Sequence, residues 1–307
     1  MNVSRTTLSR LATLALVAVS TLAVSSSFSE GTKELCEGFL PKNEMKIPVG
    51  FKSTAVGAAG LTEAQFNGVL DRISRLYAPV ISKRGGNLKI NRLWTDSTVN
   101  ASAEQKGSTW VLNMYGGLAR HQATTEEGFA LVVCHELGHH LGGAPKIAGW
   151  FGGGGWATNE GGADYYANLK CLREYFAEDD NQTLVDAAKA DGRLSAFAAN
   201  LCDQEFAQDV DRLLCKRATL GGTSVANLFS DLSKNSKLAD FSTPDKSVVK
   251  KMDDSHPATQ CRLDTYLAGS ICNVDKTVAN SDSDYRQGSC VQGVAKVGFR
   301  PLCWFKP

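Results

Sequence analysis

The 307-residue chain has little net charge and few of the features that mark repeat proteins or nucleic-acid-binding proteins. A formal net charge of +1 offers no basic surface of the kind that binds nucleic acid, so we expect no nucleic-acid partner. Internal repeats and Gly/Ser-rich linkers are absent, which excludes a repeat array and favours one large domain or two halves around a cleft. No CxxC pair is present, which disfavours a structural zinc site built from cysteines.

Residues 1–28 have the layout of a secretory signal peptide. Arg5 and Arg10 precede an apolar stretch from Leu11 to Val24, which is followed by three serines. This stretch is shorter than the about 20 residues that span a bilayer, and no cysteine stands near the expected cleavage point to carry a lipid. The sequence therefore predicts a secreted or periplasmic protein without a stable membrane anchor after signal cleavage.

Nine cysteines point to disulfide bonds, because a signal peptide directs a protein to an oxidising compartment. The odd number leaves at least one thiol unpaired, and we expect it to be Cys134, since a small apolar thiol packs well in a buried helix. The last four cysteines allow three connectivities, and the sequence does not choose between them. The nine are Cys36, Cys134, Cys171, Cys202, Cys215, Cys261, Cys272, Cys290 and Cys303.

The segment LVVCHELGHHLGGAPK, Leu131 to Lys146, contains three of the five histidines, with a glutamate between two of them. Its apolar periodicity predicts a buried helix from Thr124 to Leu141 that ends at a Gly-Gly pair. His135 and His139 stand one turn apart and project from the same face of that helix. Two imidazoles at this spacing are typical zinc ligands, so we predict that both bind a metal.

Two further histidines are expected to lie outside the site. His140 follows the motif and points about 100° away from His139 on a helix. His121 precedes the helix in a predicted loop, and we expect it to be a polar surface residue.

A catalytic zinc site needs a third protein ligand. In the pattern HExxHxxGxxH the third histidine falls where this chain has Pro145, which cannot coordinate a metal. A second predicted helix, NEGGADYYANLKCLREYF from Asn159, instead carries Glu160 and Asp164 one turn apart. We predict that Glu160 is the third ligand and that Asp164 accepts the other ring N–H of His135. The alternative for Glu160 is a solvated acid favoured by the helix dipole.

These motifs resemble the metallopeptidase family that includes the CAAX prenyl protease, HtpX and their soluble periplasmic relatives. The resemblance covers about residues 60–265 and preserves the order of the family's motifs. Members of the prenyl-protease and HtpX branches have transmembrane helices, so the resemblance here implies a soluble, exported branch. The matching residues are Asn100, Ala101 and Ala103, then Gly117 and Leu118, then Glu126 and Glu127, the HExxH helix, Glu160 and Asp164, and finally His256, Pro257 and Arg262.

The resemblance implies an α+β, zincin-type fold, with a small sheet in the N-terminal half and a mostly helical C-terminal half. Helical patterns over residues 62–77, 194–218 and 224–232 agree with that balance. We therefore expect a metallopeptidase domain over residues 29–272. Residues 273–307 form a cysteine-rich C-terminal extension outside the family core, for which a disulfide-stapled flap is the default expectation.

The predicted site is that of a zinc-dependent endopeptidase acting on proteins or peptides. Zn²⁺ held by His135, His139 and Glu160 activates a water, and Glu136 is the general base. By resemblance, His256 is a second donor to the oxyanion, and Arg262 orients its loop.

Alternatives remain at several points. Tyr165 and Tyr166 compete with His256 as oxyanion donors. The strand over residues 108–115 is either a half-buried edge strand to which substrate adds or an ordinary sheet strand. The protein as a whole could instead be a metal-binding or chaperone-like periplasmic interaction protein with little turnover, although such a protein does not need Glu136. In a latent protease, Cys36 would cap the zinc.

Overall fold

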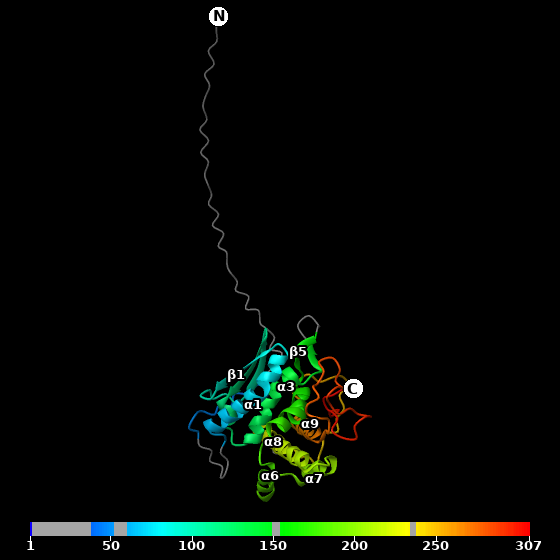
Figure 1. The fold of residues 1–307 in the computed structure, drawn as a ribbon. Coiled ribbons are helices and arrows are strands. Elements are labelled where there is room, and N and C mark those ends of the chain that lie inside the picture. Colours follow the sequence, from blue (N-terminus) through cyan, green and yellow to red (C-terminus); the bar gives the residue numbers. More distant parts are fainter. Residues whose placement is uncertain (2–37, 52–59, 149–153, 234–237) are drawn as a thin grey trace. The chain divides into compact units, whose positions relative to one another are not determined.

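The computed structural model describes residues 1, 38–51, 60–148, 154–233 and 238–307, which combine helices with two small sheets in a mixed α+β fold (Figure 1). This confirms the predicted α+β class. Cys36 lies outside the described residues, and so does the predicted signal peptide apart from Met1.

The elements are as follows. The N-terminal half contains helix α1 (Glu63–Lys83), strands β1 (Asn87–Leu93), β2 (Ala101–Lys106) and β3 (Thr109–Tyr115), the short α2 (Gly116–Ala119), and α3 (Glu126–Leu141). Strands β4 (Lys146–Ala148) and β5 (Gly154–Thr158) precede α4 (Glu160–Tyr166), which continues through the π-helical turn η1 (Ala167–Cys171) into α5 (Leu172–Tyr175). The remaining helices are α6 (Asn181–Ala190), α7 (Ala196–Glu205), α8 (Asp209–Ser233) and α9 (Thr259–Ile271).

The larger sheet has the strand order β1-β3-β2, with β1 parallel and β2 antiparallel to β3. Of the two alternatives for residues 108–115, the edge strand is wrong and the ordinary sheet strand is confirmed, because β3 lies in the middle. Its side chains from Val111 to Met114 are buried on both faces, and the amide of Asn113 donates to Ser102 and Glu104 on β2. A period-two pattern indicates an apolar face but does not say which strands flank it.

Helix α3 lies at the centre of the packing, in contact with α8, α4, α1 and β2. Every side chain from Gly128 to Leu141 is buried, so the helix has no solvent-facing polar stripe. The hydroxyl of Thr125 accepts from the Gly128 N–H at 3.1 Å and caps its N-terminus. Gly142 caps the other end, and Gly143 follows with a φ of 76° that favours glycine.

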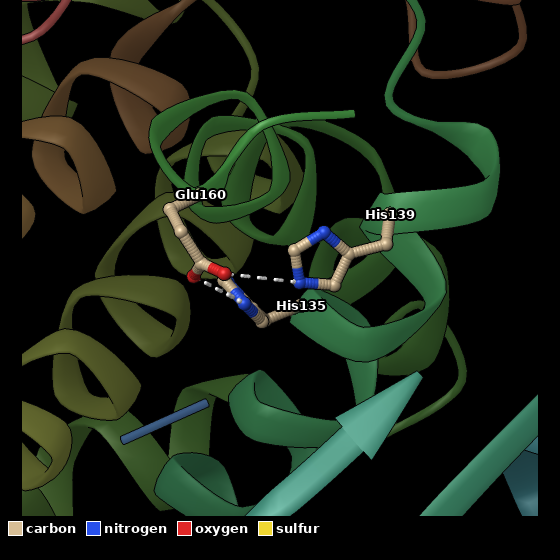
Figure 2. A group of neighbouring side chains, drawn as sticks. All are labelled: His135, His139 and Glu160. Carbon is tan, nitrogen blue, oxygen red and sulfur yellow. Dashed lines mark ion pairs between the residues drawn. The ribbon is translucent and has the colours of Figure 1, made fainter. Parts of the chain in front are cut away.

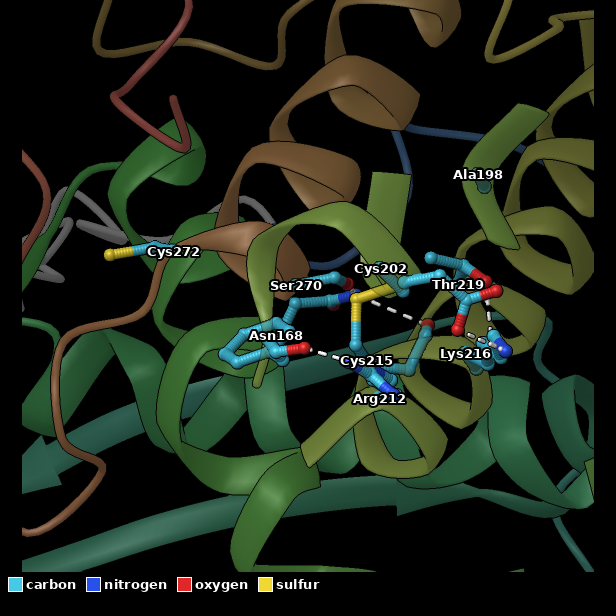
Figure 3. Close-up of a disulfide and its surroundings, with 12 residues drawn as sticks. Asn168, Ala198, Cys202, Arg212, Cys215, Lys216, Thr219, Ser270 and Cys272 are labelled. Atoms are coloured by element: carbon cyan, nitrogen blue, oxygen red, sulfur yellow. Dashed lines mark hydrogen bonds and ion pairs between the residues drawn. A yellow bond between two sulfur atoms is a disulfide. The ribbon is translucent and has the colours of Figure 1, made fainter. Parts of the chain in front are cut away.

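The predicted helical stretch 194–218 is two helices, since α7 ends at Glu205 and α8 begins at Asp209. A disulfide between Cys202 and Cys215 joins them (Figure 3), with a Cα–Cα distance of 5.7 Å. On one unbroken helix these cysteines would lie about 20 Å apart, too far to bond. The bond therefore requires the turn between the helices.

Three other disulfides join Cys134 to Cys171, Cys261 to Cys303 and Cys272 to Cys290. The prediction of a free Cys134 is wrong: its thiol faces η1 and bonds there, whereas the sequence shows only that the position is buried. Four disulfides are typical of an oxidising, extracellular compartment. Within the described part of the chain, no helix has the length and apolarity to cross a membrane.

Candidate metal centre

Two neighbouring helices bring the three predicted ligands together (Figure 2). His135 and His139 stand one turn apart on α3, and Asn159 caps α4 so that Glu160 is its first residue. The Nε2 atom of His135 lies 3.2 Å from Oε2 of Glu160, and that of His139 lies 3.7 Å from Oε1. All three side chains are buried. Such a cluster of two imidazoles and one carboxylate could hold a metal ion.

The outer nitrogen of each ligand imidazole is already engaged. Nδ1 of His135 lies 2.7 Å from Oδ1 of Asp164, as predicted from the spacing of Glu160 and Asp164. Nδ1 of His139 lies 2.8 Å from the carbonyl oxygen of Thr158. Because a carboxylate and a carbonyl accept hydrogen bonds, each ring donates from Nδ1, so that in the neutral ring Nε2 carries the lone pair that faces the centre.

The inward-facing atoms lack the partners that buried polar atoms normally have. Among the described residues, Nε2 of His135, Nε2 of His139 and Oε2 of Glu160 make no hydrogen bond despite complete burial. Leaving a buried lone pair unsatisfied typically costs about 1 to 3 kcal/mol. A cation bound at their common centre satisfies all three atoms at once, so the donor set fits a metal ion.

Asp164 is the hub of the surrounding charges. Arg262 donates to it twice, from Nε to Oδ2 and from Nη2 to Oδ1, each at 2.7 Å, and the Tyr266 hydroxyl donates at 3.0 Å. Burial raises the pKa of Asp164, but the charges of Arg262 and His135 outweigh this and hold it below its usual range. Burial lowers the pKa of His135, and Asp164 more than compensates, raising it to about 9.

Arg262 is thus a partner of Asp164, and Phe39 holds its guanidinium from the other side. Its Nη1 donates to the carbonyl oxygen of Phe39 at 2.8 Å, and its guanidinium stacks on the rings of Phe39 and Phe229. The ring of Phe39 also makes an edge contact with His135, with centroids 4.9 Å apart.

His256 lies beside Glu160, the third predicted ligand. Its Nε2 is 2.7 Å from the carbonyl oxygen of Gly38 and 3.4 Å from Oε2 of Glu160. A carbonyl requires a donor, so Nε2 carries the hydrogen and points it at Gly38. To donate to a substrate oxyanion from Nε2, His256 must first release this carbonyl.

Glu136 is buried directly after the first ligand. Neither carboxylate oxygen has a hydrogen-bond partner among the residues described. Burial raises its pKa to about 8, against a lowering by His135. A carboxyl group in this range exchanges its proton near neutral pH, which suits a general base.

The two histidines expected outside the site are both buried. His140 is stacked between Trp110 and Trp156, with ring centroids 5.0 and 4.6 Å away, and burial lowers its pKa to about 3. The expectation that His121 is a surface residue is wrong. Its side chain is buried, and its Nδ1 accepts from the N–H of Ala123 at 3.1 Å.

The two tyrosines considered as oxyanion donors are core residues. The Tyr165 hydroxyl donates to the carbonyl oxygen of Gly298 in the C-terminal extension. Tyr166 is buried with its hydroxyl paired to Tyr77. Both hydroxyls therefore have partners away from the proposed metal position. The helix backbone fixes the side on which each tyrosine lies.

Sequence reasoning missed several groups that support the centre. Tyr266 stands one turn after Arg262 on α9, so helical spacing could have placed it beside Asp164. The carbonyls of Gly38, Phe39 and Thr158 carry no sequence signal, because every residue has one.

Comparisons of the chain with protein-family models, with curated proteins and with solved structures gave no match. Its function is therefore inferred from the geometry and chemistry of the site itself.

Proposed function

We propose that this protein is an exported zinc-dependent endopeptidase of gluzincin type, with Zn²⁺ held by His135, His139 and Glu160. The observation that carries the proposal is the convergence of these three buried ligands beside the buried, unpartnered carboxyl group of Glu136. The resemblance to soluble relatives of the CAAX prenyl protease supports the same assignment.

Zinc is favoured by the type and spacing of the ligand atoms. Two imidazole nitrogens and one carboxylate form the set that catalytic zinc sites use, leaving a fourth position open. With zinc–ligand distances near 2.0 to 2.1 Å, ligand atoms of a tetrahedral site lie about 3.3 Å apart. The separations of 3.2 and 3.7 Å between the imidazole nitrogens and the carboxylate oxygens of Glu160 are close to this value.

A zinc ion held by these three residues would supply Lewis acidity and would lower the pKa of a bound water toward about 7. Glu136 accepts a proton as the water oxygen bonds to the peptide carbonyl carbon. When the C–N bond breaks, Glu136 returns that proton to the leaving amine. His256, the remaining imidazole at the centre, is the proposed donor to the oxyanion.

The free edge of β2 is the proposed binding surface for an extended peptide. The carbonyl of Ala101 accepts from the N–H of Phe39, so it faces away from β3. Alternate residues of an antiparallel strand direct their main-chain groups the same way. Ala103 and Gln105 therefore present an edge without a main-chain partner among the described residues. A peptide can add there as a further strand, which fixes its register without strong side-chain selection.

Casein or gelatin zymography of the purified mature chain tests the proposal. We expect a band of hydrolysis that a chelator removes and that zinc, added back without excess, restores. Glu136→Gln is the inactive control. Zinc bound at the site without any hydrolysis would instead identify a metal-binding interaction protein. Hydrolysis that survives both the chelator and Glu136→Gln would disprove the zinc mechanism.

A further inference from the structure

Trp304, near the end of the cysteine-rich extension, lies against the first turn of α4. Its side chain is completely buried. A Cβ atom added at Gly161 would lie 2.2 Å from Cδ2 of the indole, so the ring rests directly on the backbone beside the ligand Glu160. The glycine is needed because no side chain fits between the helix and the ring.

The same tryptophan is anchored to α9. Its Nε1 donates to the hydroxyl of Thr265 at 2.9 Å, and the preceding residue, Cys303, is bonded to Cys261 on that helix. Helix α9 also carries Arg262, which holds Asp164. In Figure 1 the end of the chain, in red, lies beside α9.

Trp304 also secures the loop that leads to His256. Its carbonyl oxygen accepts from the N–H of Asp253 at 2.9 Å. The Asn159 side chain, which caps α4, donates to the carbonyl of Asp253 at 3.2 Å. One residue of the extension thus contacts the helix of Glu160, the loop of His256 and the helix of Arg262.

We propose that Trp304 is a positioning residue for Glu160, so that the C-terminal extension is an integral part of the metal centre. Glu160 stands at the start of a helix whose next two residues are glycines, so Gly161 and Gly162 contribute no side chains to hold the first turn of α4. Its position depends on the indole on one side and the Asn159 cap on the other. A ligand held loosely loses metal affinity even though its chemistry is intact.

This inference rests on the proposed zinc site, and zinc affinity measured by chelator competition tests it without reference to activity. Trp304→Leu should weaken zinc binding about 10- to 100-fold, the usual effect of removing a group that supports a ligand. The matched control is Phe66→Leu, a fully buried aromatic on α1. It should lower Tm but leave zinc affinity within about threefold of the wild type. Equal zinc affinity in the two variants would overturn the proposal.

A double-mutant cycle covers the case in which Trp304→Leu does not fold. Gly161→Ala should weaken zinc binding, because its methyl group meets the six-membered part of the indole, to which the nearest atoms belong. Valine has no atoms beyond Cγ and so removes this part, and Gly161→Ala with Trp304→Val should therefore bind zinc more tightly than Gly161→Ala alone. If the double variant binds more weakly than the single, Trp304 does not act through this contact.

His139→Ala separates the two proposals. If it retains zinc, or if the wild type binds none, the metal centre itself is wrong and this inference falls with it. If His139→Ala loses zinc while the Trp304 and Gly161 variants keep wild-type affinity, only the positioning role is wrong.

Discussion

Asp164 holds His135 with a 2.7 Å contact between Oδ1 and the ring Nδ1, and both groups are completely buried. Asp164→Asn leaves the Arg262 guanidinium without its counter-charge. We expect an about 10- to 100-fold loss of zinc affinity and a loss of about 3 to 5 kcal/mol in the free energy of unfolding. Chelator competition and urea denaturation measure the two effects. The control is Asp264→Asn, which changes a different buried carboxyl group, on α9, and should leave zinc affinity unchanged.

The metal content of variants tests the ligand assignment. Purified mature protein should contain close to one zinc per chain by elemental analysis. His139→Ala and Glu160→Ala should lose it, while Glu136→Gln should keep it, because the base is not a ligand. A Glu160→Ala variant with full zinc content would show that the third ligand lies elsewhere.

Zinc binding should release protons. Without metal, the pKa of His135 is about 9, so its ring is protonated at neutral pH, whereas a zinc ligand must be neutral. Zinc affinity should therefore rise with pH and level off above about 9. In a Glu136→Gln background, which removes the carboxyl group with a pKa of about 8, calorimetry in buffers of different ionisation enthalpy should find about one proton released at pH 6, where a zinc-bound water still keeps most of its protons. No proton release would contradict a charged His135.

The role of His256 follows from how its loss affects the kinetics. If it donates to the oxyanion, His256→Ala should lower kcat and kcat/KM together by about 10²- to 10³-fold, with KM and zinc content nearly unchanged. Because His256 also contacts Glu160, its competing role is to support that carboxylate as a zinc ligand. Weaker zinc binding in His256→Ala would assign His256 to the support of Glu160 instead.

The four disulfides of the described residues pair eight of the nine cysteines, and the ninth, Cys36, lies outside those residues. Alkylation of the native, unreduced protein should label Cys36 alone, and peptide mapping should recover Cys134 bonded to Cys171. Labelling of Cys134 would contradict the observed pairing. A covalent dimer that resists alkylation would place Cys36 in a bond between two chains.

Local sequence was sufficient to predict the helices that carry the ligands. Helical periodicity places His135 and His139 on one face of α3, and the same one-turn spacing places Asp164 where it can reach His135. Local sequence also placed the start of α3 at Thr124 or Thr125 and that of α4 at Asn159, and Thr125 and Asn159 are the observed caps. These features depend on residues within a few positions of each other, which is why they can be read without the fold.

The tertiary structure alone decided which of these surfaces meet. Burial of Cys134 is visible in the sequence, but its bond to Cys171 requires the packing of α3 on η1. Arg262 reaches Asp164 across 98 residues, and Trp304 covers Gly161 from the far end of the chain. A sequence pattern encodes which face of an element is apolar, but not which element covers it, because that choice is made by the packing of the whole core.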